Sequence, residues 1–256
     1  MQRYFIDQVM EKDLPVSITG DDFHHMVRVM RMKTGDEIWL VDSNEKVARA
    51  TLQEILEDEV TLAVSSFVEK TSELPVEITI ASGLPKGDKL DLIVQKGTEL
   101  GAAQFLFFQA ERSVTKWDEK KVHKKMERLE RIAKEAAEQS HRERIPLLRY
   151  HSSLSALFKS EIQAFDFVVC AYEESAKQGE SSSLARVFQE MPKGSRLLVV
   201  FGPEGGISEQ EVTELRELDA RFAGLGPRIL RTETAPLYLL AAASFYFELS
   251  GKSENE

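Results

Sequence analysis

From residue 76 onward, short apolar runs alternate with longer segments in which apolar residues recur every three or four positions. The apolar runs occupy residues 76–80, 105–108, 165–171 and 197–201, and the helical segments occupy residues 89–100, 118–139, 184–190, 208–219 and 236–249. Strands that are apolar along their whole length are typical of a parallel sheet with helices on both faces. The pattern therefore predicts an α/β domain over residues 73–256.

Residues 1–72 follow a different pattern, in which short strand-like segments are separated by turn residues. Strands are expected over residues 37–41, 46–54 and 59–64, and one helix over residues 21–30, with Asp21 or Asp22 as its cap. Strands at this spacing predict a small β-barrel. The polar segment 69–75 ends in a proline, so we place the domain boundary near residue 72.

Composition is that of an ordinary globular protein. Of the 256 residues 30% are charged and 42% are hydrophobic, and no apolar run approaches the roughly 20 residues of a membrane-spanning helix. The single cysteine, Cys170, lies in an apolar run, so a buried core thiol is expected and an internal disulfide is excluded. We expect a cytoplasmic protein that does not interact with membranes.

The formal net charge of −10 argues against a nucleic-acid partner, but this charge is unevenly distributed. Residues 112–149 hold 12 Lys+Arg and 7 Asp+Glu, a local net charge of +5, whereas the rest of the chain carries −15. A basic segment of this kind suits a phosphate backbone. From charge alone, a solvated helix face with i,i+4 pairs such as Glu127 with Arg131 is the simpler explanation.

A glycine-rich link at Phe201–Ser208 joins an apolar strand to a helix. Ser208 and Glu211 fit the S-x-x-E capping box, which supports a helix start at this point. Glycines at such a junction let a ligand approach backbone amides, at the edge where open α/β sheets bind ligands. The link lacks the spacing of phosphate-binding and dinucleotide-binding loops, and a tight turn without a ligand is the alternative.

Residues 224–236 repeat this arrangement, with two glycines interrupting an expected strand over residues 222–230. Pro236 is expected at the first position of the following helix. Arg228 and Arg231 suit an anionic group nearby, although solvation or a salt bridge also explains them. Two such loops in one sheet favour a ligand site over two tight turns.

The last helical segment, residues 237–247, is apolar on nearly all sides. A helix at a protein surface is normally amphipathic, and this one is too short to span a bilayer. It is therefore expected in the core, in a subunit interface or in both, and we favour a dimer interface.

Histidines and cysteines give no sign of a metal site. His24 and His25 are adjacent and point in different directions on a helix, and no Cys/His cluster has zinc spacing. Arg28 and Arg31 are expected on one helical face, where they could contact phosphates or solvent. No nucleophile–base pair typical of a hydrolase is recognisable.

Several short segments, spread in order over nearly the whole chain, form a recognisable pattern. They are Arg3–Phe5, His25–Arg31, Gly35–Asp36, Lys86–Lys89, Gln95–Gly101, Glu111–Ser113, Glu138–Ser140, Gly202–Gly206 and Leu225–Ala235. Together they resemble the bacterial family that methylates N3 of a uridine in 16S ribosomal RNA. The last two segments in combination are the most specific.

This resemblance implies a fold and a cofactor that the residue pattern alone does not give. It implies an N-terminal PUA-like, RNA-binding β-barrel, a C-terminal α/β domain of the SPOUT class with a deep trefoil knot, and a homodimer that uses S-adenosylmethionine. In that class the cofactor lies in the knot and is held largely by backbone groups of the two glycine loops. The residues so implied are Gly202, Glu204, Gly205, Leu225, Gly226, Ile229, Leu230, Arg231 and Thr234.

Methylation at uridine N3 requires loss of a proton from a poor nucleophile. A cation near the uracil oxygens would stabilise the resulting anion, and the candidates are Arg112, our first choice, Arg142, Lys86 and Arg231. Glu138, Glu99 and His141 are candidate proton acceptors. The predicted catalytic residues are Arg112, Glu138 and Arg142, and the predicted RNA-binding residues are Arg3, Arg28, Arg31, Lys86, Lys120, Lys121 and Lys124.

The partner implied by the resemblance is 16S ribosomal RNA, free or within the small ribosomal subunit. Two alternatives stay open. A non-catalytic RNA-binding factor for ribosome assembly would use the barrel and the basic segment but would not need two glycine loops. A SPOUT methyltransferase that acts on another RNA, or on a 2'-hydroxyl, would keep the cofactor and change the target.

Overall fold

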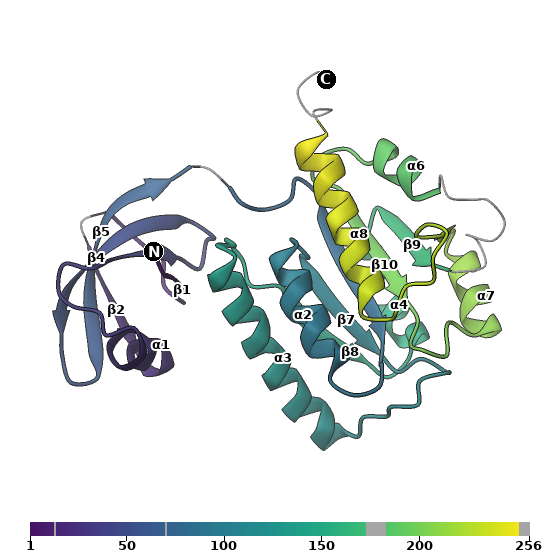
Figure 1. Ribbon diagram of the computed structural model, residues 1–256, viewed down its shortest axis with the longest axis horizontal. Coiled ribbons are helices and arrows are strands. Elements are labelled where there is room, and N and C mark those ends of the chain that lie inside the picture. The colour runs from purple at the N-terminus through teal and green to yellow at the C-terminus, as the bar shows by residue number, and fades with distance from the viewer. Residues whose placement is uncertain (13, 70, 173–182, 251–256) are drawn as a thin grey trace. The chain divides into compact units, whose positions relative to one another are not determined.

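A computed structural model describes residues 1–12, 14–69, 71–172 and 183–250, which divide into two units (Figure 1). The N-terminal unit comprises residues 1–73 and 137–144, and the C-terminal unit comprises residues 74–136 and 145–256. Residues 137–144 therefore group with the N-terminal residues despite their distance in sequence, which a single division at residue 72 does not capture.

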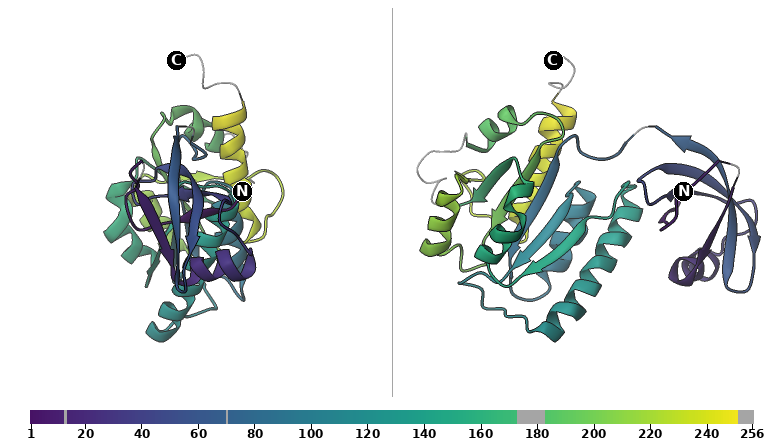
Figure 2. Two further views of the ribbon diagram at one scale, coloured as in Figure 1. Left: turned by 90° about the vertical axis from the view of Figure 1, so that its left-hand side faces the viewer. Right: turned by 180° about the vertical axis from the view of Figure 1, so that it is seen from behind.

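The N-terminal unit is built on a five-stranded mixed sheet that forms half of a barrel. Its strands are β1 (Arg3–Phe5), β2 (Pro15–Thr19), β3 (Glu37–Val41), β4 (Val47–Ile55) and β5 (Glu59–Val68), in the order β1-β3-β4-β5-β2. Only the β1–β3 pair is parallel. Register shifts along β4 mark bulges, and bulges bend strands, in keeping with the curvature of β4 and β5 in Figure 2.

The expected helix over residues 21–30 is two short elements. An α-helix, α1 (Gly20–His24), is followed by a π-helical turn, η1 (His25–Val29), which buries Met26 in the core of the unit. The prediction of an aspartate cap is wrong, because the N-cap residue is Thr19 and no side chain caps the helix. Asp21 and Asp22 lie instead in the first turn, where the helix dipole favours negative charge.

The C-terminal unit contains the predicted parallel sheet. Its strands are β6 (Glu77–Gly83), β7 (Gln104–Phe108), β8 (Leu147–His151), β9 (Phe167–Ala171), β10 (Arg196–Phe201) and β11 (Arg221–Ala223), in the order β11-β9-β10-β6-β7-β8. Each neighbouring pair is parallel, so all six carboxyl ends lie at one edge. The edge strand β8 was not predicted, because its sequence mixes apolar and charged residues.

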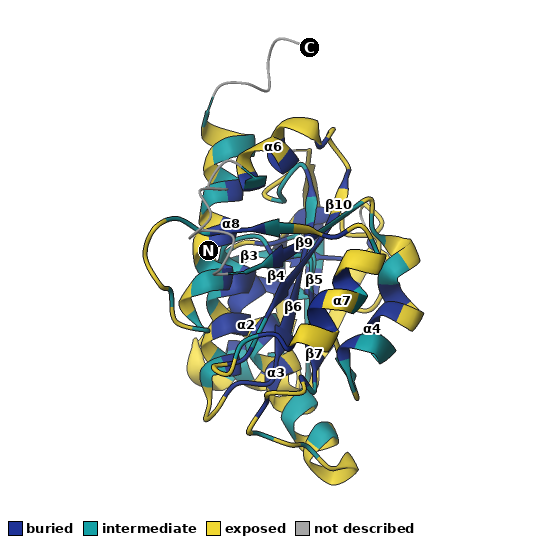
Figure 3. Ribbon diagram, turned by 90° about the vertical axis from the view of Figure 1, so that its right-hand side faces the viewer, coloured by how far each residue is buried: buried dark blue, intermediate teal, exposed yellow. Residues whose placement is uncertain are grey.

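Helices cover both faces of this sheet. They are α2 (Lys89–Glu99), α3 (Glu119–Gln139), α4 (Leu154–Glu161), η2 (Ile162–Ala164), α6 (Ser183–Glu190), α7 (Glu209–Glu217), α8 (Thr234–Ser244) and the π-helical turn η3 (Phe245–Leu249). Buried residues of α2, α3, α6 and α8 form one core cluster, and those of α4 and α7 form another on the opposite face. Figure 3 shows buried residues along the central strands and exposed residues on the outer sides of the helices.

The two core clusters explain the apolar strands. In β7, Phe105 and Phe107 belong to one cluster while Leu106 and Phe108 belong to the other, because successive side chains point to opposite faces. Cys170 in β9 is fully buried, as predicted, and burial raises the pKa of its thiol to about 12. Within the described residues, no helix has both the length and the apolar character needed to cross a membrane.

The second glycine-rich segment differs from the prediction. The expected strand over residues 222–230 is limited to β11, Arg221–Ala223, and a loop follows. Within this loop Gly226 has a φ of +94°, which other residues rarely adopt. Helix α8 begins at Thr234, so Pro236 occupies its third position, where the missing N–H still costs no helical hydrogen bond.

Candidate functional site

A cavity of about 480 Å³ lies at the carboxyl edge of the sheet in the C-terminal unit. Ala171 and Phe201, the last residues of β9 and β10, line it, and Leu225 lines it two residues beyond the end of β11. The cavity thus forms where three neighbouring strands end. Its volume lies within the range of roughly 300–1,000 Å³ that is usual for small-molecule and cofactor sites.

The first glycine loop connects β10 to α7 along one side of the cavity. Ser208 caps α7: its Oγ accepts a hydrogen bond from the Glu211 N–H at 3.2 Å, and the Glu211 carboxylate accepts from the Ser208 N–H at 2.8 Å. This confirms the predicted capping box. The other oxygen of Glu211 accepts from the Glu111 N–H at 3.0 Å, so one carboxylate holds both this loop and the loop after β7.

Close packing between these two loops accounts for Gly205. A Cβ atom at this position would lie 2.8 Å from the carbonyl oxygen of Arg112 and 2.9 Å from its Cβ. The Arg112 guanidinium lines the cavity and donates a hydrogen bond to the Ile207 carbonyl at 3.2 Å. The missing side chain therefore lets the backbone of Arg112 approach, and the loop carbonyls orient its charge.

The second glycine loop forms the opposite side of the cavity. Its start is fixed to the sheet, because the Tyr172 N–H donates to the Ala223 carbonyl at 3.0 Å. Of the predicted pocket residues, Gly202, Glu204, Leu225, Gly226, Ile229, Leu230 and Arg231 line the cavity. Gly205 lies between lining residues, and Thr234 begins α8 beside the lining residue Ala235.

Sequence reasoning missed several lining residues, among them Lys89, Ala171 and Tyr172. Ala171 and Tyr172 carry no motif, but the end of a buried parallel strand is itself a signal, since all such ends share one edge. Lys89 belongs to the segment Lys86–Lys89, which is part of the family resemblance, but it is not among the predicted cofactor-binding, catalytic or RNA-binding residues. It contacts Glu204 and Glu233, both of which are distant in sequence.

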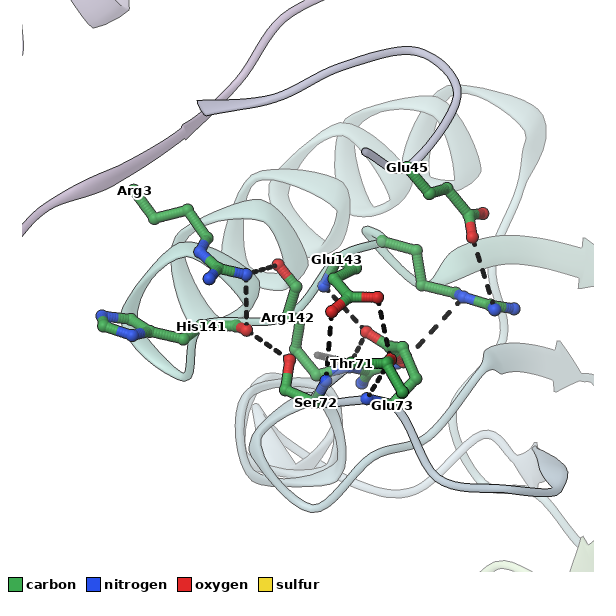
Figure 4. Close-up of polar contacts among 9 residues, drawn as sticks. Arg3, Glu45, Thr71, Ser72, Glu73, His141, Arg142 and Glu143 are labelled. Atoms are coloured by element: carbon green, nitrogen blue, oxygen red, sulfur yellow. Dashed lines mark hydrogen bonds and ion pairs between the residues drawn. The ribbon is translucent and has the colours of Figure 1, made fainter. Parts of the chain in front are cut away.

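Of the predicted catalytic residues, Arg112 lies at the cavity, whereas Glu138 and Arg142 belong to the N-terminal unit. The Arg142 side chain is only 3% exposed, and its Nη2 lies 2.5 Å from Glu73 Oε2 (Figure 4). Glu138 contributes to raising the pKa of Tyr4, after the larger effect of burial. Because Arg142 is buried against Glu73, the geometry gives it a structural role and does not support the predicted catalytic one.

Arg3, predicted to bind RNA, is also buried. Its Nη1 donates to the carbonyl oxygens of His141 at 2.6 Å and Arg142 at 2.8 Å, so it joins β1 to the segment after α3. In the same segment, the pKa of His141 is lowered, first by burial and then by Arg3. The geometry therefore supports a structural role for Arg3.

The other predicted RNA-binding residues are exposed. They are Arg28, Arg31, Lys86, Lys120, Lys121 and Lys124. The prediction that Arg28 and Arg31 share a helical face is wrong, because Arg31 follows the helix with a φ of +54°. Lys121 and Lys124 line a separate hollow beside α3.

Two further residues proposed for the chemistry, a proton acceptor and a cation, lie in the C-terminal unit. Glu99, a candidate proton acceptor, accepts hydrogen bonds from Lys96 Nζ on the same helix at 2.7 and 3.0 Å. Arg231, a candidate cation, lines the cavity. Within the described residues, no group of three or more His, Cys, Asp or Glu side chains is placed to hold a metal ion.

The C-terminal unit is an α/β domain with a cofactor-sized cavity between two glycine loops, and the N-terminal unit is a small β-domain. This combination defines the class of two-domain, cofactor-binding α/β proteins. Residues 72–244 match the family described as RNA methyltransferase domain, and residues 18–65 match the RNA methyltransferase PUA domain. The chain therefore belongs to this family of RNA methyltransferases.

Similar proteins agree with this assignment. The chain is 52% identical to ribosomal RNA small subunit methyltransferase E of Bacillus subtilis, over 97% of this chain and 98% of that protein. The same enzyme from Neisseria gonorrhoeae, solved bound to S-adenosylmethionine, has a TM-score of 0.82 and 25% identity, with 96% and 98% of the chains covered. A Legionella pneumophila structure containing the same cofactor has a TM-score of 0.80 and 26% identity, covering 94% and 96%. These similarities confirm the expected PUA-like and SPOUT fold class.

The buried Glu73–Arg142 pair predicts a pH-dependent stability. Burial by itself would raise the pKa of Glu73, but the hydrogen bonds and charge of Arg142 hold it below its usual value of 4.5. The stabilisation is therefore present above about pH 4.5 and is lost as pH falls through the lowered pKa. We expect Glu73→Gln to lower the free energy of unfolding by about 3 kcal/mol at pH 7, because it leaves the Arg142 charge buried, and by clearly less at pH 3.5.

Urea unfolding measures this difference, read by Trp39 fluorescence in a Trp117→Phe background so that the signal reports the N-terminal unit. Glu45→Gln is the matched control, because Glu45 pairs with Arg144 at 3.4 Å but its side chain is 52% exposed. Its effect should stay below about 1 kcal/mol. An equal loss of unfolding free energy for Glu73→Gln at pH 7 and at pH 3.5 would contradict the structural role assigned to the Glu73–Arg142 pair.

Proposed function

We propose that this protein is an S-adenosylmethionine-dependent methyltransferase that methylates N3 of a specific uridine in 16S ribosomal RNA and acts in the cytoplasm. The observation that carries the proposal is the cavity between the two glycine loops, within a domain of the RNA methyltransferase family. The Bacillus subtilis relative, named for the small-subunit ribosomal RNA, supports the choice of RNA. The position on the base rests on the sequence resemblance.

The residues at the cavity fit this cofactor. Its volume is suitable, and Gly202 and Gly206 line one wall without side chains. The missing side chain at Gly202 also lets the loop fold back on itself, because a Cβ atom there would lie 2.9 Å from the carbonyl carbon of Gly206. Arg228 and Arg231 on the opposite loop offer positive charge to a carboxylate, and Glu204 offers negative charge to a cationic group. When bound, the cofactor supplies an activated methyl group, so the protein mainly positions the two reactants.

We assign to Arg112 the role of stabilising the deprotonated uracil. Its guanidinium lines the cavity and is oriented by the Ile207 carbonyl, so a fixed charge would face the developing anion. Arg231 lines the same cavity and is the second candidate. N3 lies on the pairing edge of the base, so the target uridine must be unpaired or turned out of its stack.

The first prediction from the proposed function concerns the methyl-transfer reaction. The protein should transfer radiolabelled methyl groups to small-subunit RNA from a strain lacking the gene, and mass spectrometry should identify 3-methyluridine. Arg112→Gln should lower kcat about a hundredfold, as expected for loss of one oxyanion-stabilising donor, while the affinity for S-adenosylmethionine changes little. Arg112→Lys keeps the charge and should retain more activity.

Arg196→Gln is the control, because Arg196 is exposed at the amino end of β10, opposite to the cavity edge of the sheet. Detection of a 2'-O-methylated nucleoside, or of methyl transfer to a different RNA, would contradict the proposed target. Absence of S-adenosylmethionine binding to the wild-type protein would favour a non-catalytic assembly factor.

A second prediction concerns the basic face of α3. Lys120, Lys121 and Lys124 are exposed, and Lys121 forms an ion pair with Asp118 at 3.4 Å that is itself solvent-exposed. We propose that these lysines contact RNA phosphates. Reversing all three to Glu should weaken RNA binding and make it less dependent on salt, because fewer counterions are released. Affinity for S-adenosylmethionine should not change.

The control reverses Lys159, Arg186 and Lys193, which are exposed residues of the same unit outside α3. This variant carries the same change in net charge. Filter-binding titrations of both variants at several salt concentrations separate a local contact from a general electrostatic effect. Equal RNA affinity in the two variants would contradict the proposed contact surface.

We further propose that the protein is a homodimer. Helix α8 buries Leu239, Leu240 and Ala243, whereas in the turn η3 Phe245 is 63% exposed and Leu249 is 72% exposed. Exposed apolar residues on one side of a terminal helix are typical of a subunit interface.

The third prediction follows from this surface. Sedimentation velocity should show a dimer for the wild-type protein and a monomer for Phe245→Asp, because an unpaired charge would be buried in the interface. Val29→Asp is the control, because Val29 is 66% exposed but lies in η1 of the N-terminal unit. A monomeric wild-type protein at micromolar concentration would contradict the dimer.

A further inference from the structure

Lys89 lies where three elements of the C-terminal unit meet beside the cavity. It is the first residue of α2 and lines the cavity. Its Nζ lies 2.7 Å from Glu204 Oε1 and 3.3 Å from Glu233 Oε2. Glu204 belongs to the first glycine loop, and Glu233 is the residue before α8, at the end of the second. One ammonium group therefore joins the two loops that enclose the cavity.

The two carboxylates depend on Lys89 to different degrees. Both oxygens of Glu204 also accept from the Lys86 N–H, at 3.2 and 3.3 Å. The Oε2 atom of Glu233 is buried and faces Lys89 Nζ at 3.3 Å, although the side chain as a whole is 19% exposed. Loss of the Lys89 charge would leave this oxygen without its ion-pair partner, and we expect Glu233 to shift toward solvent, because an uncompensated buried carboxylate oxygen is disfavoured.

The ion pairs are stable at neutral pH. The hydrogen bond to Glu204 raises the pKa of Lys89, and Glu233 adds to this effect. Burial by itself would raise the pKa of Glu204, but the hydrogen bond from Lys89 and those from backbone N–H groups lower it. Glu204 is therefore a fixed anion near pH 7 and a weak proton acceptor, which suits a positioning role.

We propose that Lys89 is a positioning residue that holds the two glycine loops in the cofactor-binding arrangement through Glu204 and Glu233. This inference rests on the proposed function, since it concerns the affinity for S-adenosylmethionine. Lys89 acts through the loops: fixing them before binding reduces the conformational entropy that cofactor binding would otherwise cost. Its loss should therefore affect cofactor binding more than the methyl-transfer step.

Calorimetry with S-adenosylmethionine and steady-state kinetics test the proposal. We expect Lys89→Met to raise the Kd and the KM for the cofactor about tenfold, through lost preorganisation, while kcat changes much less. Lys89→Arg keeps the charge and should restore most of the affinity. Lys96→Met is the matched control, because Lys96 lies on the same helix and forms an ion pair of 2.7 Å with Glu99. Neither of these two residues lines the cavity.

A double-mutant cycle with Glu204→Gln identifies the path of the effect. If Lys89 acts through Glu204, Lys89→Met should weaken binding less in the Glu204→Gln background than in the wild type. Three outcomes would overturn the proposal: an equal fold-change in the Kd for S-adenosylmethionine in both backgrounds, wild-type affinity for Lys89→Met, or no rescue of the affinity by Lys89→Arg.

Amide hydrogen exchange of the full chain without cofactor gives an independent readout. Lys89→Met should speed exchange in residues 202–208 and 224–233 but not in β7, and Lys96→Met should change neither loop. Failure of the wild-type protein to bind S-adenosylmethionine would contradict the proposed function. Unchanged exchange in both loops would instead contradict the role of Lys89, so the two failures are distinguishable.

Discussion

The parallel pairing of β9, β10 and β11 is the constraint on which the site depends. Val200 is in register with Cys170, and Phe222 is in register with the same residue from the other side. Since the three strands run in one direction, their carboxyl ends meet at one edge, and the two glycine loops begin on either side of the end of β9. Pairing in the opposite direction would place one loop at the far edge of the sheet, and no cavity would form between them.

Side chains from other elements then fix these loops. Glu211 joins the first loop to the backbone of Glu111 after β7, and Gly205 lets the backbone of Arg112 pack against it. Lys89 joins Glu204 to Glu233 from the start of α2. Each contact joins segments far apart in sequence, so the site forms only when α2, the loop after β7 and the two glycine loops are folded together. This dependence suits a protein that positions its reactants, because small displacements of either loop would alter their alignment.

Local signals made several parts of the structure predictable. The apolar runs marked β7, β9 and β10 because both faces of these strands are buried, and Ser208 with Glu211 marked the start of α7 because a capping box acts within four residues. The strand β8 was missed, since edge strands need less apolar sequence. The segment after Ala223 is apolar enough to suggest a strand, yet it is a loop, in which Gly226 has a positive φ. Arg142 looked catalytic, but its partner Glu73 lies 69 positions away.

The sequence by itself determined the class of fold, the two glycine loops, the buried Cys170 and the uneven distribution of charge, because these follow from local composition and spacing. Only the tertiary structure decided which charged residues face the cavity and which are buried in ion pairs. Arg112 and Arg142 are the same residue type in the same basic segment, yet one lines the cavity and the other is buried against Glu73. Their difference arises from contacts across the fold, where a charge must either meet solvent or be paired.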